Sequence, residues 1–320
     1  MVCNMSLKVC LPWKKPRKIE KITRNAKETA HLLGHLALFN SLEKVCREYG
    51  EGKISCPPRT YISLPEHGHL FSMVASAHDI TVHKLILVNP NNRKRDLPLV
   101  HSEVRVYDSK SGESILLLDG PTVTERRTAV LSAVGMRHLC SAPPSEGMLI
   151  GTGKLAISHL QAFNILFPNV SFWIKATSEA KAKEFCRKHS SIGVELRPCT
   201  SNVVPESVDV VITMTSSTNP VYSEPAIAGR LLIGVGTCNP NASEIFADTV
   251  RSSQVVIDEK TGGINEAGDL LQANIDWSEV HSLSDILTSQ PDFSRPIFFK
   301  TVGCAAWDLA AARVAIDTAR

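Results

Sequence analysis

The spacing of apolar residues divides the chain into two regions. Residues 26–50 carry apolar side chains three and four positions apart, which predicts a helix that ends near Gly50. Between residues 60 and 119 the apolar residues come instead in short runs separated by turn residues. This pattern predicts a mostly antiparallel sheet. Its strands are expected at 60–64, 70–75, 83–88, 100–108 and 114–119.

After Gly120-Pro121 the pattern changes to strands that alternate with helices. A helix is expected at 122–139, followed by strands at 148–150, 171–175, 194–197, 208–214, 231–234 and 254–257. Helices are expected between them at 155–167 and 179–189, with a short helix after the strand at 208–214. This alternation predicts an α/β fold of Rossmann type, with a parallel, doubly wound sheet.

The last predicted helix, 302–316, follows the complete parallel sheet. We expect it to return to the first region, which would then be a discontinuous α+β domain with antiparallel strands. The predicted division is a basic arm at 1–25, a first domain at 26–128 and 300–320, and a Rossmann dinucleotide-binding domain at 129–299.

Charge and composition exclude several classes of partner. The chain has 320 residues, of which 43% are hydrophobic, and a formal net charge of +3, which is too small to indicate nucleic-acid binding. No run approaches the roughly 18 apolar residues of a membrane helix, and the N-terminus has no apolar signal core. The nine cysteines lack metal-site spacing, so we expect reduced thiols, no metal and a cytoplasmic protein.

Basic residues gather only at the head of the chain, and they are Lys14, Lys15, Arg17, Lys18, Lys21 and Arg24. We interpret this segment as a solvated, poorly ordered arm; an interaction or targeting arm is the alternative.

An apolar run at 148–150 leads directly into Gly-x-Gly-x-x-Ala and then into helical spacing. Gly151 allows the tight turn, Gly153 lets the backbone approach phosphates, and Ala156 lets the helix pack against the strand. The free N–H groups of such a helix N-terminus bind anions. The sequence therefore predicts a pyrophosphate-binding turn formed by Gly151, Thr152, Gly153, Lys154, Leu155 and Ala156.

The end of the next strand indicates which dinucleotide is bound. Enzymes that use NAD usually carry Asp or Glu there to accept the ribose 2′-OH. This chain has Lys175, Ala176 and Thr177 instead, with Lys181 downstream, so NADP(H) is preferred and NAD(H) is the alternative. The hydroxyl-rich segment after 208–214 adds Thr215 and Ser216. We also include Val235, Gly236 and Thr301 in the predicted cofactor site.

Several motifs resemble those of the ornithine cyclodeaminase/mu-crystallin family. Residues 118–129, LDGPTVTERRTA, are similar to its DG-x-x-x-T-x-x-RT-A motif. Pro57-Pro58-Arg59, Lys84, Asn89-Pro90, the segment EAGDLL at 266–271 and KTVG at 300–303 follow in the family's order, and the resemblance covers roughly residues 28–317. The sequence at 119–128 is most similar to that of the Δ1-pyrroline-2-carboxylate/Δ1-piperideine-2-carboxylate (ketimine) reductase branch.

This resemblance implies a function. Arg59, Lys84 and Arg127 would bind the carboxylate of a cyclic imino acid. Cationic side chains suit that role, because Arg binds carboxylates bidentately and Lys adds a compact charge. The imine nitrogen would gain its proton either from Lys84, the candidate catalytic residue, or from water before the substrate binds. The reaction would be NAD(P)H-dependent reduction of the five- or six-membered ketimine to L-proline or L-pipecolate. The first domain would also pair two copies into a homodimer.

Two positions depart from the family pattern. Cys238 stands where ornithine cyclodeaminases carry an aspartate, which makes ammonia-releasing cyclisation doubtful, and Leu99 stands where many relatives have threonine. The alternatives are a mu-crystallin-like NADPH-dependent binding protein for a small ligand, and an amino-acid dehydrogenase of the same family.

Overall fold

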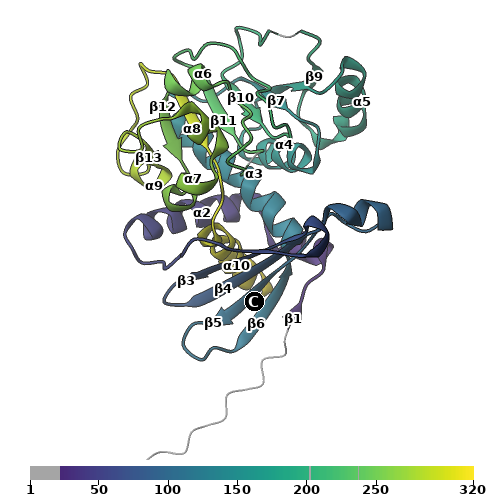
Figure 1. The fold of residues 1–320 in the computed structure, drawn as a ribbon, viewed down its shortest axis with the longest axis vertical. Coiled ribbons are helices and arrows are strands. Elements are labelled where there is room, and N and C mark those ends of the chain that lie inside the picture. The colour runs from purple at the N-terminus through teal and green to yellow at the C-terminus, as the bar shows by residue number, and fades with distance from the viewer. Residues whose placement is uncertain (1–21, 202, 237) are drawn as a thin grey trace, which may run out of the picture.

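Two separate sheets organise the chain, one above the other in Figure 1. The protein is described by a computed structural model, which covers residues 22–201, 203–236 and 238–320. Most of the basic arm, residues 1–21, lies outside these residues. Together the two sheets and their helices confirm the α/β fold with a Rossmann-type sheet and a second α+β region.

The upper sheet has eight strands in the order β13-β12-β14-β11-β10-β7-β8-β9, and every pair is parallel. The chain runs outward from β7 to β8 and then returns to β10 on the other side, which makes a topological switch point. Its strands are β7 (Glu146–Ile150), β8 (Ser171–Lys175), β9 (Leu196–Pro198), β10 (Val210–Thr213), β11 (Leu231–Gly234), β12 (Gln254–Ile257), β13 (His281–Ser282) and β14 (Ile297–Lys300). Its helices are α4 (Lys154–Leu166), α5 (Glu179–His189), α6 (Ala247–Arg251), α7 (Lys260–Glu266), α8 (Gly268–Ala273) and α9 (Leu283–Ile286).

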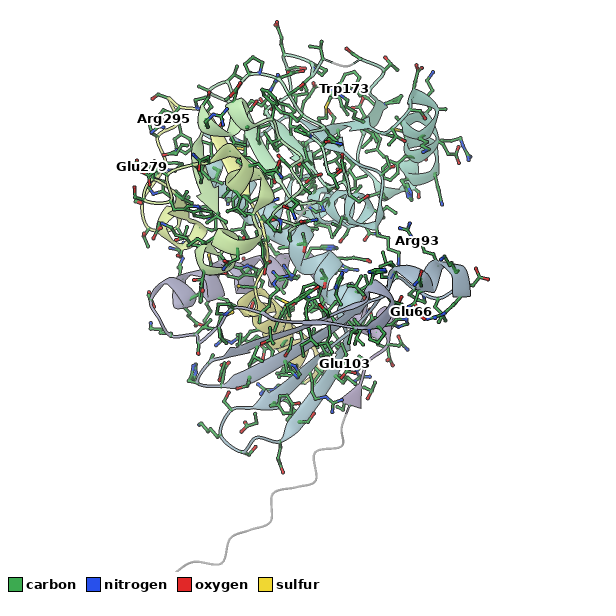
Figure 2. All side chains as sticks on the ribbon, viewed as in Figure 1. Glu66, Arg93, Glu103, Trp173, Glu279 and Arg295 are labelled. Carbon is green, nitrogen blue, oxygen red and sulfur yellow. The ribbon has the colours of Figure 1, made fainter. Side chains whose placement is uncertain are left out.

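The lower sheet has six strands in the order β1-β6-β5-β4-β3-β2. All its pairs are antiparallel except β1 with β6. The strands are β1 (Ile22–Thr23), β2 (Thr60–Ser63), β3 (His69–Ser76), β4 (Ile80–Val88), β5 (Val100–Asp108) and β6 (Ser114–Asp119). Two 3₁₀ turns, η1 (Pro65–His67) and η2 (Pro90–Arg95), project beside this sheet, near the labels of Glu66 and Arg93 in Figure 2, and Arg95 pairs with Glu66.

Four helices connect the two sheets: α1 (Ala26–Leu32), α2 (His35–Gly50), α3 (Gly120–Leu139) and α10 (Ala305–Ala319). Helix α10 leaves the edge of the upper sheet after β14 and packs against α2, β3 and β4 (Figure 1). Helix α3 runs without interruption across the expected boundary at residue 128, and Gly135 near its end lies against the Phe299 ring of β14. Helix α3, which contacts β4, β5 and β6 as well as β11, therefore joins the two sheets.

The structure corrects two predicted helices. Residues 26–50 form two helices, because the chain breaks at Leu33-Gly34, and the first begins with a capping box between Asn25 and Glu28. The short helix expected after β10 is wrong, since residues 214–230 contain no helix. Two prolines in that segment lack the N–H that a helix requires.

Some predicted boundaries also shift. The end of the expected arm is ordered, because Ile22–Thr23 forms β1 and Asn25 caps α1. Helix α10 begins at Ala305, three residues later than expected, because Gly303 has a φ of +75°. Within the described residues, no helix is long and apolar enough to cross a membrane.

Candidate active site

The predicted cofactor residues follow the carboxyl ends of neighbouring strands in the upper sheet. The register pairs Ile150 with Lys175 and with Thr213, Thr213 with Gly234, and Gly234 with Lys300. The segments that carry the predicted residues therefore begin along one edge, at the switch point. Ligands of open α/β sheets bind in the crevice at this edge.

The Gly-x-Gly-x-x-Ala turn has the geometry of a phosphate site. Gly151 has a φ of +123°, and a Cβ there would lie 2.7 Å from the Met214 carbonyl oxygen, so glycine is required. Gly153 is the N-cap of α4, and a Cβ there would meet no protein atom within 4 Å. Ala156 is fully buried. These residues fit a pyrophosphate at the helix N-terminus.

The end of β8 carries no carboxylate. Lys181 donates to the Thr177 hydroxyl at 3.0 Å, and Ser178 caps α5. The nearest acidic residue, Glu179, is paired with Lys183 along the helix surface. Lys175 and Ala176 are half-buried at the strand end. The structure thus brings the predicted ribose-side residues to one place.

The segments after β10 and β11 are held by Glu244, a residue that the sequence did not single out. Its buried carboxylate accepts the main-chain N–H of Thr215 at 2.6 Å and of Gly236 at 2.7 Å, as well as the hydroxyls of Thr213 and Thr215. Of the other predicted residues, Ser216 is exposed, Val235 is buried, and Thr301 is buried and donates its N–H to Gly234.

Lys84 and Arg127, which are distant in sequence, meet at the carboxylate of Asp308. Lys84 lies on the inner face of β4 and is 1% exposed; its Nζ donates to Asp308 Oδ1 at 3.0 Å and to the Thr124 hydroxyl at 2.6 Å. Arg127 on α3 donates from Nε to the same oxygen at 3.3 Å. Asp308 on α10 is fully buried, and its Oδ2 atom has no hydrogen-bond partner among the described residues.

This cluster perturbs the titration of Lys84. Burial lowers the pKa of the Lys84 ammonium to about 8, with Arg127 and Arg59 adding to the decrease and Asp308 opposing it. Two cations share the Asp308 carboxylate, so these three groups taken alone carry one excess positive charge. The buried carboxylate of Asp258, which accepts the N–H groups of Val302 and Gly303, also acts on Arg127.

Arg59 lies in the extended segment directly before β2 and approaches the Lys84–Arg127–Asp308 cluster from there. Its guanidinium donates to the carbonyls of Val302 and Gly303 at 3.1 and 2.8 Å, and its Nε pairs with Glu266 Oε1 at 3.0 Å. A Cβ on Gly303 would lie 2.7 Å from the Arg127 guanidinium, so Arg59 and Arg127 flank one glycine. Because Gly303 follows β14, Arg59 and Arg127 lie beside the carboxyl edge of the upper sheet, and Lys84 joins them through Asp308.

The sequence analysis assigned no role to three acidic residues that lie near this site: Asp308, Glu266 and Glu244. Asp308 did leave a signal, since it is the lone acid within the apolar run 305–312 of the last helix. Glu266 was noted only as part of a family motif. Burial raises the pKa of its carboxyl, an effect that Arg59 opposes. Glu244 stands among polar residues and left no signal.

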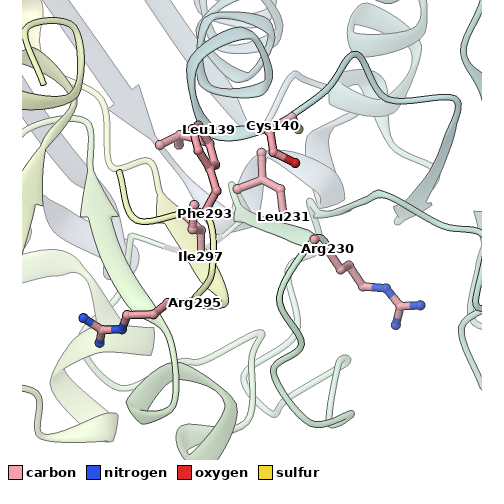
Figure 3. Close-up of a pocket in the computed structure, with 9 residues that line it drawn as sticks. Leu139, Cys140, Arg230, Leu231, Phe293, Arg295 and Ile297 are labelled. Atoms are coloured by element: carbon pink, nitrogen blue, oxygen red, sulfur yellow. The ribbon is translucent and has the colours of Figure 1, made fainter. Parts of the chain in front are cut away.

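Neither Cys238 nor the pocket of Figure 3 adds a catalytic group to this site. The Cys238 thiol, in the position of the family aspartate, contacts the Val302 carbonyl oxygen at 3.4 Å. A small pocket in Figure 3 lies at the opposite edge of the sheet, where Leu231 and Ile297 begin β11 and β14. There Arg230 is bound to Glu224 and to the Val208 carbonyl. The described residues also contain no group of three or more potential metal ligands.

Comparisons with known proteins identify the family. The model of the ornithine cyclodeaminase/mu-crystallin family matches residues 19–320. A Δ1-pyrroline-2-carboxylate reductase of Burkholderia multivorans is 45% identical over 293 residues, which cover 92% of this chain and 94% of that protein. A Δ1-pyrroline-2-carboxylate/Δ1-piperideine-2-carboxylate reductase of Azospirillum brasilense is 44% identical, with the same coverage.

A solved structure extends this likeness to three dimensions. The Δ1-pyrroline-2-carboxylate reductase of Thermococcus litoralis, in complex with NADH and L-proline, superimposes with a TM-score of 0.83 at 26% identity, covering 93% of this chain and 96% of that one. The resemblance inferred from the motifs is thus confirmed over nearly the whole chain. This protein belongs to the ornithine cyclodeaminase/mu-crystallin family.

Proposed function

We propose that this protein reduces cyclic ketimine 2-carboxylates with NAD(P)H, converting Δ1-pyrroline-2-carboxylate to L-proline and Δ1-piperideine-2-carboxylate to L-pipecolate. The observation that carries the proposal is the buried Lys84–Arg127–Asp308 cluster beside a dinucleotide crevice. The relative at 45% identity is named for reduction of Δ1-pyrroline-2-carboxylate, and the one at 44% identity for reduction of both ketimines.

The cluster supports binding of an acid. With Arg127 and Lys84 sharing Asp308, one carboxylate of the substrate would balance the excess charge, and Arg59 would approach it from the opposite side of Gly303. Charge-assisted hydrogen bonds of this kind are stronger than neutral ones. Holding the carboxylate at several points fixes the neighbouring C=N bond in one orientation, which converts an encounter into a near-attack geometry.

Lys84 is the proposed proton donor. When bound, the reduced nicotinamide supplies the hydride that the imine carbon accepts, while the ring nitrogen must gain a proton. With a pKa of about 8, the Lys84 ammonium is protonated near neutral pH yet acidic enough to release its proton. Thr124 and Asp308 orient this ammonium.

We further propose NADPH as the preferred cofactor, with NADH as the alternative. Lys175, Thr177 and Lys181 lie at the end of β8, where an acidic residue would otherwise accept a ribose 2′-OH. Positive and hydroxyl side chains suit a 2′-phosphate instead.

The proposed assembly is a homodimer in the cytoplasm. Ile62, Val74 and Leu87 lie exposed on the outer face of the lower sheet, on the side opposite to the buried Lys84 and Val82. A paired copy would cover this apolar face. Every cysteine that the structure describes is a free thiol, as is usual in a reducing compartment.

The decisive experiment offers the purified protein both ketimines with NADPH and, separately, with NADH. We expect stoichiometric cofactor oxidation and formation of L-proline and L-pipecolate, measured by chiral chromatography. Pyruvate with ammonia or methylamine serves as the open-chain comparison. NADPH binding without turnover of any ketimine would refute the proposal and favour a mu-crystallin-like binding protein. Turnover only with the open-chain mixture would indicate an amino-acid dehydrogenase.

A further inference from the structure

We infer that Glu244 is a positioning residue that shapes the nicotinamide half of the cofactor crevice. The inference rests on the proposed function only in taking a nicotinamide dinucleotide as the ligand. No motif of the sequence assigns a role to this residue.

The carboxylate of Glu244 joins the segments that follow the paired strands β10 and β11, just beyond the last backbone hydrogen bond between them, from Val235 N–H to the Thr213 carbonyl. Oε1 accepts the N–H and the hydroxyl of Thr215, at 2.6 and 2.8 Å, and Oε2 accepts the N–H of Gly236 at 2.7 Å and the Thr213 hydroxyl at 3.1 Å. Four donors thus meet one fully buried carboxylate. Buried charges are tolerated where hydrogen bonds satisfy them, so the four donors fix both segments relative to each other.

A second buried carboxylate holds Glu244 itself. Asp269 Oδ1 accepts the N–H groups of Glu244 and Ile245, at 2.6 and 3.0 Å, and Asp269 Oδ2 pairs with Lys300 at 2.7 Å. Lys300 ends β14, the strand next to β11. A continuous set of buried polar groups therefore links the carboxyl ends of β10, β11 and β14.

The topology places this set on one half of the crevice. The pyrophosphate turn follows β7, and the ribose-side residues follow β8, on one side of it. Strands β10, β11 and β14 lie on the other side of β7. An extended dinucleotide whose adenosine lies over β8 must therefore place its nicotinamide over the segments that Glu244 holds.

Close packing makes the arrangement intolerant of change. A Cβ on Gly236 would lie 2.3 Å from the Thr215 carbonyl oxygen and 2.6 Å from Glu244 Oε1. A shift of the segment at Thr215 or of the segment at Gly236 would therefore change the surface that we expect to contact the nicotinamide. The ribose-side residues after β8 would stay in place.

The test compares binding of the whole cofactor with binding of its adenosine half. Glu244→Gln keeps the size of the side chain but turns an amide NH₂ group toward hydrogen-bond donors. We expect the Kd for NADPH, measured by cofactor fluorescence, to rise at least about tenfold, which corresponds to roughly 1.4 kcal/mol. The Kd for 2′,5′-ADP, measured by calorimetry, should change less than about twofold. NADH and AMP replace these ligands if the protein binds NADH.

A matched control exists at the opposite edge of the same sheet. Asp209 accepts the N–H of Ser145 at 2.7 Å, the N–H of Glu146 at 3.1 Å and the Ser145 hydroxyl at 3.0 Å. Asp209→Asn removes a comparable set of bonds away from the crevice and should leave both Kd values unchanged. Thr213→Val removes one donor to Glu244 and decides the question if Glu244→Gln does not fold.

Two results would overturn the inference. Equal weakening of NADPH and 2′,5′-ADP would make Glu244 a general structural residue, and unchanged NADPH affinity in both variants would remove it from the cofactor site. Since the readout is binding, the proposed ketimine reduction could fail in the wild-type protein while this inference stands.

Discussion

The two halves of the candidate site differ in whether backbone groups or side chains form them. The nucleotide half consists largely of backbone: a glycine turn, a helix N-terminus and strand ends whose N–H groups are fixed by Glu244. The proposed acid-binding half consists of buried charged side chains, Lys84, Arg127 and Asp308, contributed by β4, α3 and α10. Backbone sites depend on local conformation, whereas the charge cluster depends on three elements meeting.

This difference has energetic consequences. Replacing an exposed side chain beside a backbone site usually changes stability by less than about 0.5 kcal/mol. A buried ion pair behaves otherwise, because removing one partner leaves an uncompensated charge and costs about 3–5 kcal/mol. Substitutions in each half test this difference.

The largest effect is expected at Asp308. Asp308→Ala leaves Lys84 and Arg127 buried without their shared anion, so the free energy of unfolding should fall by about 3–5 kcal/mol, measured by urea titration. Asp317→Ala on the same helix is the control, because Asp317 is exposed, and it should change stability by less than about 0.5 kcal/mol. A similar loss in both variants would contradict the buried-cluster account.

The next effect concerns turnover. Lys84→Met removes a charge-assisted contact to the substrate carboxylate and the proposed proton donor, so kcat/KM for the ketimine should fall on the order of 100-fold. The Kd for NADPH should remain within about twofold, because Lys84 lies in the other half of the site. Lys53→Met, at an exposed position, is the control. Normal turnover in Lys84→Met would remove Lys84 from the reaction.

The pH dependence follows from the same residue. Burial lowers the pKa of Lys84 to about 8 in the free enzyme, so the ammonium is present below that pH and lost above it. Because the charged form binds the carboxylate, kcat/KM should decrease above about pH 8, approaching a tenfold decrease per pH unit. The residual activity of Lys84→Met should lack this limb. A limb of equal position in both proteins would assign it to another group, such as the imine.

The smallest effect is expected in the nucleotide half. Lys175→Glu places a carboxylate at the end of β8, where it would repel a 2′-phosphate and suit a ribose 2′-OH. The Kd for NADPH should rise by about tenfold relative to that for NADH, measured by cofactor fluorescence. Lys188→Glu, further along α5, is the control. Equal changes for both cofactors would place the 2′-phosphate elsewhere.

The two halves differ in how much of their structure could be predicted from the sequence. The alternation of strands and helices predicted the parallel sheet, and Gly151 and Gly153 marked its phosphate turn, since both depend on local periodicity and backbone freedom. The short strands β13 and β14 and the helices α6 to α9 were not predicted, because segments of two to seven residues carry too little pattern. The break at Gly34 was missed because apolar spacing continues across it.

The sequence by itself determined the longer helices, the core strands of the two sheets and the position of the Gly-x-Gly-x-x-Ala turn, and through motif resemblance it proposed the cations Arg59, Lys84 and Arg127. Only the tertiary structure showed that Lys84 and Arg127 share Asp308, and that Glu244 joins two strand ends. The physical reason is distance along the chain: local conformation is encoded by neighbours, whereas a buried charge acquires its partner only when α10 returns to the lower sheet and brings residue 308 against residue 84.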